Sequence, residues 1–175
     1  MGLDMYLTRS KRVEGLSTKD YSQIDESILF PPEEVVDLGK LNPEIPKASE
    51  LNESVIKRGT TSFNWSSILE QVGYWRKANH IHQWFVEQCQ GGVDKCQLTE
   101  ITKQRLEMLL SACRLVLDNH EQASALLPTQ GGFFFGSTDY DEYYFNDIRD
   151  TVKIIEEVLE TTDFSTQIIF YQSSW

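Results

Sequence analysis

Both ends of this chain carry the pattern of a β-strand, and this feature constrains the fold more than any other. In residues 2–13 the apolar Leu3, Met5 and Leu7 alternate with more polar neighbours, which is the period of a strand with one buried face. Residues 166–175 are rich in β-branched and aromatic side chains and contain no Gly or Pro. Terminal strands stay ordered chiefly by joining a sheet, so we expect the two ends to pair with each other.

Helical patterns fill much of the chain between these strands. Residues 66–90 predict one amphipathic helix with Ile81 and Phe85 on its buried arc, ended by Gly91 and Gly92. Residues 99–119 predict a second helix with Thr99 as N-cap. Its core stripe is Leu106, Leu109, Leu110, Cys113, Val116 and Leu117.

Two further helices are expected near the C-terminal end. A short one covers residues 120–126 and is stopped by Pro128. A long one runs to about residue 161 and begins at Asp139, which has capping-box spacing to Glu142. Its expected buried face consists of Tyr144, Ile148, Val152, Ile155 and Leu159.

Residues 14–60, called the arm from here on, have a different composition. They hold four of the five prolines and few aromatic residues. We expect short helices over 18–28 and 32–38 and loop elsewhere. The arm is interpreted as a surface excursion from a single domain spanning residues 1–175. A lid over a site and a partner-contact arm are the alternatives.

These elements predict an α+β fold, in which a small antiparallel sheet from the two chain ends is packed by about three main helices. A hairpin near residues 132–135 is a possible addition to that sheet. The proportion of hydrophobic residues, 40%, is typical of a globular chain.

Charge excludes one large class of partners. Sixteen Lys and Arg against 27 Asp and Glu give a net charge of −11 and a pI near 4.7. Such a surface repels duplex nucleic acid, whose binding depends on basic residues that displace counterions. A small anionic ligand needs only a few well-placed cations and is not excluded.

Three cysteines without a CxxC pair argue against a disulfide framework and a zinc knuckle, and they suit a reducing cytosol. Cys89 and Cys113 fall at apolar helical positions and are predicted to be core residues, with a catalytic cysteine as the alternative. The first residues lack the regions of a signal peptide, and no apolar stretch reaches the roughly 18 residues of a membrane span. We therefore expect a cytoplasmic protein that does not contact a membrane.

Known catalytic templates are missing from the sequence: there is no GxSxG, HExxH, P-loop or GxGxxG. His80 and His82 are two residues apart, so their rings would point about 200° apart on a helix and could not share a metal. His120 belongs to the end of another predicted helix. The sequence thus predicts no metal site and no cofactor.

Residues 74–85 contain an unusual mixture for a plain helix. Trp75 offers a flat face for stacking on a ring, and Arg76 and Lys77 offer charge for a phosphate or carboxylate. Asn79 and His82 are i, i+3 neighbours that could present donors side by side. The alternative is ordinary packing, above all for His82 and Trp75 on the apolar arc.

Residues 130–144 combine glycines with aromatic residues. Gly136, Ser137 and Thr138 are expected to lead directly into a helix N-terminus, where free N–H groups bind anions. Asp139 and Asp141 compete for that role as caps. The candidate ligand contacts of this stretch are Gln130, Phe134, Gly136, Ser137, Thr138, Tyr140 and Tyr143. A tight turn with core aromatics is the alternative.

The segments MGLDMYL, YWRKANHIHQWF, LLPTQGGFFFGSTDYDEYY and YQSSW together resemble a family of small proteins from bacteriophage and prophage genomes. The resemblance covers nearly the whole chain apart from roughly the arm. It implies a phage protein that acts in the bacterial host cytoplasm, and it implies no particular activity. By analogy, small phage proteins of this kind often counter host immunity, some by capturing a nucleotide second messenger.

Three functions are carried forward. The first is a homo-oligomeric binding protein that captures a small anionic, ring-containing ligand, such as a nucleotide-derived immune signal. The second is a hydrolase or transferase acting on a similar ligand, with His82 as general acid or base oriented by Asp139 or Asp141. The third is an inhibitor of a host protein, which would use an acidic face containing Glu156, Glu157 and Glu160.

Overall fold

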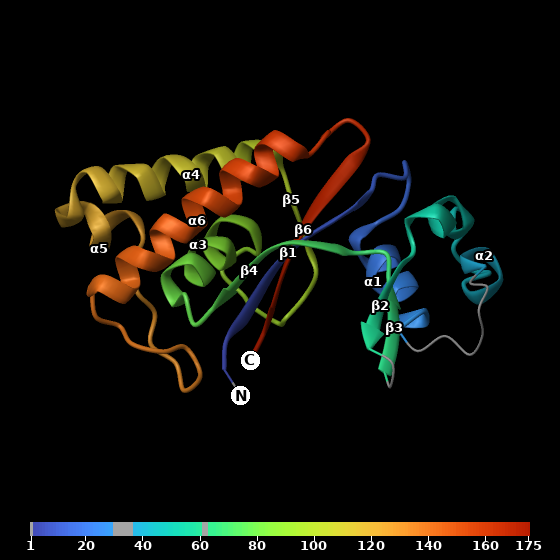
Figure 1. The fold of residues 1–175 in the computed structure, drawn as a ribbon, viewed down its shortest axis with the longest axis horizontal. Helices are drawn as coiled ribbons and strands as arrows, with labels where there is room; N and C mark the ends of the chain where they lie inside the picture. Colours follow the sequence, from blue (N-terminus) through green and yellow to red (C-terminus); the bar gives the residue numbers. More distant parts are fainter. Residues whose placement is uncertain (1, 30–36, 61–62) are drawn as a thin grey trace.

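The computed structural model describes residues 2–29, 37–60 and 63–175, and it has an α+β fold. One antiparallel sheet has the strand order β4 (Glu70–Arg76), β1 (Asp4–Lys11), β6 (Gln167–Ser174), β5 (Thr99–Ile101). The first and last strands form its centre, and they pair over their full length, from Asp4 opposite Ser174 to Lys11 opposite Gln167. The two ends of the chain therefore lie side by side (Figure 1), as the sequence predicts.

The period of two decides which face each strand residue covers. Leu3, Met5 and Leu7 are fully buried on one face, which confirms the predicted alternation. On β6, Ile169 and Tyr171 join the same core as these residues, whereas Ile168 and Phe170 belong to a second core. The central sheet is therefore covered on both faces.

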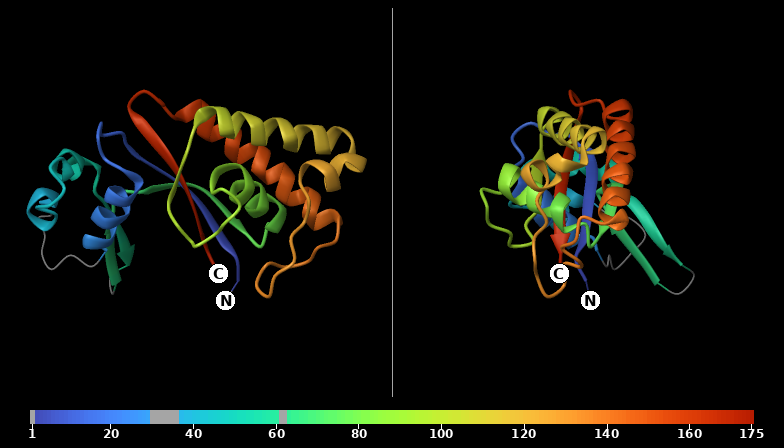
Figure 2. Two further views of the ribbon diagram at one scale, coloured as in Figure 1. Left: turned by 180° about the vertical axis from the view of Figure 1, so that it is seen from behind. Right: turned by 90° about the vertical axis from the view of Figure 1, so that its left-hand side faces the viewer.

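Three helices cover the first face: α3 (Asn79–Cys89), α4 (Lys103–Asp118) and α6 (Glu142–Thr161). Figure 2 shows α4 and α6 lying side by side over α3 and the sheet. The short η2 (His120–Gln122) and α5 (Ala123–Leu126) connect α4 to the loop before α6. We call the apolar cluster between these helices and the sheet the helix-side core. It contains the predicted stripe of α4 and, from α6, Tyr144, Ile148, Ile155 and the partly buried Val152 and Leu159.

The arm is more structured than the loop-rich excursion that its composition predicts. It forms α1 (Thr18–Ser27), α2 (Leu38–Leu41), η1 (Ala48–Ser54) and β2 (Ile56–Thr60), and β2 pairs with β3 (Phe63–Ser67). Ser17 and Asp20 form a capping box that begins α1. Tyr21 of α1 packs against Phe170 of β6, with ring centroids 5.0 Å apart. The expected helix over 32–38 lies almost entirely outside the described residues.

The single helix expected over residues 66–90 is wrong, because its first part is the edge strand β4. Gly73 allows β4 to pass close to α6, since a Cβ there would lie 2.7 Å from the Ile154 Cγ2. The strand ends at Arg76, the next residue, Lys77, has a left-handed φ of 62°, and α3 begins only at Asn79. The apolar residues on both sides of this strand-to-helix boundary happen to fit one helical spacing, so the sequence pattern did not reveal where the strand ends and the helix begins.

Two predicted helix starts also differ from the structure. Thr99 lies on β5, and the N-cap of α4 is Thr102, whose side chain accepts a hydrogen bond from the Arg105 amide. The N-cap of α6 is Asp141, which accepts from the Tyr144 amide, and not Asp139. In both cases another residue able to cap lies two or three positions along the chain, so composition alone did not select the correct one.

Candidate functional site

Trp75 belongs to the helix-side core and not to a ligand site. It is 4% exposed, and its indole N–H donates to the Thr151 hydroxyl of α6 over 2.8 Å. Its ring also packs near Phe85 of α3. Trp75 is therefore a packed core residue, which was the alternative interpretation of it.

Asn79 holds the glycine-rich loop in place. Its side-chain amide donates to the carbonyl oxygens of Phe135 and Ser137, over 3.0 and 2.7 Å, and its carbonyl accepts from the Gln130 amide over 2.9 Å. Asn79 is 2% exposed. Because each polar atom of its side chain already has a partner, Asn79 positions the loop and does not present donors beside His82.

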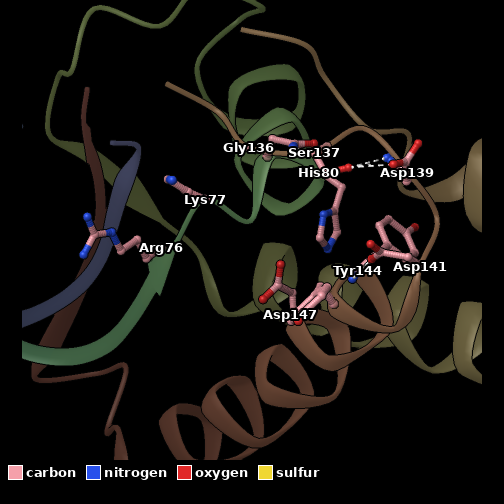
Figure 3. A pocket seen from close by; sticks show the side chains of 11 residues that line it. Arg76, Lys77, His80, Gly136, Ser137, Asp139, Asp141, Tyr144 and Asp147 are labelled. Carbon is pink, nitrogen blue, oxygen red and sulfur yellow. Dashed lines mark hydrogen bonds between the residues drawn. The ribbon is translucent and has the colours of Figure 1, made fainter. Parts of the chain in front are cut away.

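A pocket of about 270 Å³ lies between the end of β4, the start of α3, the loop and the first turns of α6 (Figure 3). We call it the His80 pocket. Its lining residues are Arg76, Lys77, Asn79, His80, Gly136, Ser137, Asp139, Asp141, Tyr143, Tyr144 and Asp147. It thus brings together five of the predicted ligand contacts besides Asn79, from two separate stretches of the sequence: Arg76, Lys77, Gly136, Ser137 and Tyr143.

His80 is the most unusual residue of this pocket. It is 2% exposed, and within the described part of the chain its Nε2 atom has no hydrogen-bond partner. Its ring packs against Tyr144 at 4.2 Å between centroids and extends toward Asp147 and Tyr144 of α6 (Figure 3). Burial lowers the pKa of His80 to about 3, so the ring is neutral near pH 7.

Acidic and phenolic groups form the wall opposite His80. Burial and the nearby Asp150 and Asp141 raise the pKa of Asp147 to about 6. The Asp147 carboxylate extends into the same space as the His80 ring (Figure 3). The Tyr144 hydroxyl donates to the Leu127 carbonyl over 2.8 Å, and burial raises its pKa. This end of the pocket therefore offers acceptors and one neutral ring nitrogen.

The two cations lie at the other end. Arg76 and Lys77 leave the end of β4 with their charged groups directed away from His80 (Figure 3). The Arg76 Nε lies 4.0 Å from an Asp4 carboxylate oxygen, and its side chain is 61% exposed. Lys77 packs its Cβ against Gly136, whose φ of 89° only glycine adopts readily. The pocket is thus cationic at one rim and acidic at the other.

His82 lies in a different environment, and its predicted pairing with Asp139 or Asp141 is wrong. Its Nδ1 contacts the Tyr171 hydroxyl at 2.8 Å, and its Nε2 is 3.4 Å from an Asp94 carboxylate oxygen. Burial lowers the pKa of His82, and the Asp94 charge partly opposes this shift. His80 and His82 therefore face separate places, as their spacing in the sequence predicts.

The remaining loop residues have mostly structural contacts. The Phe134 carbonyl accepts from the Leu3 amide over 3.1 Å, in a turn and not in the suggested hairpin. The Thr138 carbonyl accepts from the Thr129 hydroxyl, and the Tyr140 hydroxyl accepts from the Thr129 amide. Residues 136–138 do not lead directly into α6, because Asp141 begins that helix, so the expected anion site at its N-terminus is not formed by them.

Sequence reasoning missed the residues that define the pocket, namely His80, Tyr144 and Asp147. The sequence predicts no role for His80 beyond excluding a metal shared with His82, and none for Asp147. Their spacing on α6 gave a signal, because Tyr144 and Asp147 are i, i+3 neighbours on one side of the helix. Cys113 is buried as predicted and Cys89 half-buried, and burial raises their pKa values to about 12 and 11.

Comparisons with protein-family models, curated proteins and solved structures give no match. The resemblance to phage and prophage proteins therefore remains an expectation. Within the described ranges, no group of three or more His, Cys, Asp or Glu side chains is arranged to hold a metal ion. No helix among these residues combines the length and apolar character needed to cross a membrane.

Proposed function

We propose that the protein binds a small anionic, ring-containing molecule of the nucleotide type in the His80 pocket. The observation that carries this proposal is the buried Nε2 of His80, which has no partner among the described residues. Leaving a buried polar atom without a hydrogen bond costs about 1–3 kcal/mol. A ligand atom that pairs with Nε2 would recover this free energy, which makes the pocket better suited to the bound state.

The distribution of charge supports a ligand with two unlike ends. Arg76 and Lys77 line one rim, where an anionic group such as a phosphate would be neutralised. Asp147 and Asp141 line the other, where they would accept hydrogen bonds from the N–H or O–H groups of a ring. Tyr143 at the rim is 81% exposed and could cover the ring face. A nucleotide has both ends.

Within the phage context that the resemblance implies, the proposal extends to capture of a nucleotide-derived immune signal. Capture works by enclosure, so it needs no chemistry, but it needs a Kd below the signal concentration. That is roughly nanomolar, or about −12 kcal/mol. Burial of the ligand between protomers of a homo-oligomer would help to reach this affinity.

A capture experiment tests the proposal directly. Purified protein is incubated with mono-, di- and cyclic nucleotides and ADP-ribose derivatives, filtered free of unbound material, denatured, and the released compounds are identified by mass spectrometry. An intact compound in stoichiometric amount is the expected result. No bound compound and no altered compound would overturn both binding and turnover.

His80→Phe separates a binding role from a structural one. The substitution keeps a ring against Tyr144 but removes the unpartnered nitrogen. We expect stability to rise by about 1–3 kcal/mol, measured by urea unfolding, while ligand binding is lost. His120→Phe is the matched control, because His120 stacks on Phe145 outside the pocket and should change neither quantity. Unchanged ligand affinity in His80→Phe would contradict the proposal.

Turnover in the same pocket is the second candidate. His80 and Asp147 both have shifted pKa values and share one cavity, an arrangement found at acid–base sites. Here the filtrate of the capture experiment would contain a chemically changed compound. Asp147→Asn would then abolish product formation, whereas under pure capture it would only weaken binding.

A further inference from the structure

A second pocket, of about 260 Å³, is lined in part by Gln130 and Phe135 of the loop that Asn79 holds. Asp94, Gln130 and Trp175 line it together with residues of α3. We call it the Trp175 pocket. Its polar lining differs from that of the His80 pocket, since no Lys or Arg is among the described residues around it.

Two amide oxygens in this lining have no partner. The Oε1 atoms of Gln83 and Gln130 are both buried without a hydrogen bond to any described residue. The Gln83 amide is fixed in orientation, because its nitrogen donates to the Glu87 carboxylate over 2.8 Å and that carboxylate can only accept. The Gln83 Oε1 atom is therefore a hydrogen-bond acceptor with no donor among the described residues.

The charged groups of the lining are acceptors as well. Glu87 lies on α3 and Asp94 in the loop before β5. Asp94 accepts hydrogen bonds from the Cys96 amide and the Ser173 hydroxyl. Asp94 also anchors an aromatic wall, because it accepts the Trp175 indole N–H over 2.6 Å. Trp175 and Phe135 meet edge to face, with centroids 6.0 Å apart, and Trp175 remains 51% exposed.

From these observations we infer that the Trp175 pocket binds a small organic cation that donates hydrogen bonds, such as a primary ammonium or a guanidinium. Such a group would pair with the free Gln83 oxygen, lie in a pocket whose lining includes the Glu87 and Asp94 carboxylates, and contact aromatic rings, which attract cations. This site is separate from the nucleotide proposal and does not depend on it.

The test uses agmatine, which carries both an ammonium and a guanidinium group. Protein labelled with ¹⁵N is titrated while the indole N–H signals of its four tryptophans are followed, with Trp175 assigned from Trp175→Phe. We expect a saturable shift of the Trp175 signal with a Kd below about 1 mM. Tetramethylammonium has the same charge without N–H donors and should bind at least about 10-fold more weakly.

Matched variants locate the site. Gln83→Leu should weaken agmatine binding about 10-fold, and Glu87→Gln about 2- to 5-fold. Gln88→Leu, on the exposed side of α3, and Glu107→Gln, on α4, should leave the affinity unchanged. Urea unfolding of each variant checks that it is folded.

Three results would overturn the inference: no saturable shift of Trp175, equal affinity for tetramethylammonium, or equal weakening by the Gln83 and Gln88 variants. Arg76→Ala distinguishes the two proposals, because it should weaken nucleotide binding and leave agmatine binding intact. If one of the two ligands does not bind, only the proposal for its own pocket is refuted.

Discussion

Replacing Asn79 with alanine tests whether the loop between the two pockets depends on a single side chain. Three hydrogen bonds are lost, to the Phe135 and Ser137 carbonyls and from the Gln130 amide. At about 0.5–1.5 kcal/mol each, the loss of stability should be about 2–4 kcal/mol. For a chain of 175 residues, this corresponds to a fall in Tm of about 5–15 °C.

The assay is urea unfolding combined with amide hydrogen exchange. Exchange at Gln130 should accelerate in Asn79→Ala, because its amide loses its acceptor. Asn119→Ala is the control, since Asn119 makes one exposed capping bond to the Glu121 amide and should lose only about 0.5–1 kcal/mol. Equal losses in both variants, with unchanged exchange at Gln130, would refute the role assigned to Asn79.

Trp75→Phe should lower the free energy of unfolding by about 1–3 kcal/mol and leave nucleotide affinity unchanged. A double-mutant cycle with Thr151→Val should give a coupling energy near 1 kcal/mol, and zero coupling would contradict the hydrogen bond between Trp75 and Thr151. Gly73→Ala should lower the free energy of unfolding by about 1–3 kcal/mol through the clash with Ile154. In an Ile154→Ala background the effect of Gly73→Ala should be smaller, and strictly additive effects in urea unfolding would argue against the clash. Because the pKa of His80 falls from 6.5 to about 3 on folding, its titration leaves the free energy of unfolding unchanged above pH 6.5 and lowers it as the pH falls toward 3. His80→Phe should therefore lose less stability than the wild type between pH 6.5 and 4, and parallel curves would disprove this assignment.

The fold was largely predictable from the sequence because its main elements have strong periodic patterns. The alternation around Met5 and the β-branched run at Ile168 and Ile169 identify the paired terminal strands, and Leu106 to Val116 identify α4. Strand β4 was not predictable by the same means, since its apolar residues also fit a helical arc that continues through Ile81. The antiparallel pairing of β4 with β1, a tertiary contact, decides between the two periods.

The candidate site was predictable only in part. The sequence singled out Arg76, Lys77 and the Gly136 loop, which the structure brings together. The sequence could not show that the Asn79 side chain would be hydrogen-bonded to loop carbonyls, nor that His80 would be buried without a hydrogen-bond partner for its Nε2 atom. The first depends on how α3 meets a loop more than fifty residues later in the chain, and the second on how α3 packs against α6. No local sequence pattern predicts either contact.

The central position of β6 has a consequence for how the chain acquires its structure. Of the four strands of this sheet, β1 is synthesised before the others and can pair with β4 once residue 76 has been made, but its second neighbour comes more than 150 residues after it. Such distant pairing is slow, because the long intervening loop must close before the contacts form. The alternating side chains of β6 belong to both cores, so neither core is complete until this last strand arrives. A nascent chain that has not yet made β6 exposes apolar surface on both faces of an unfinished sheet, which is the state most in need of a chaperone.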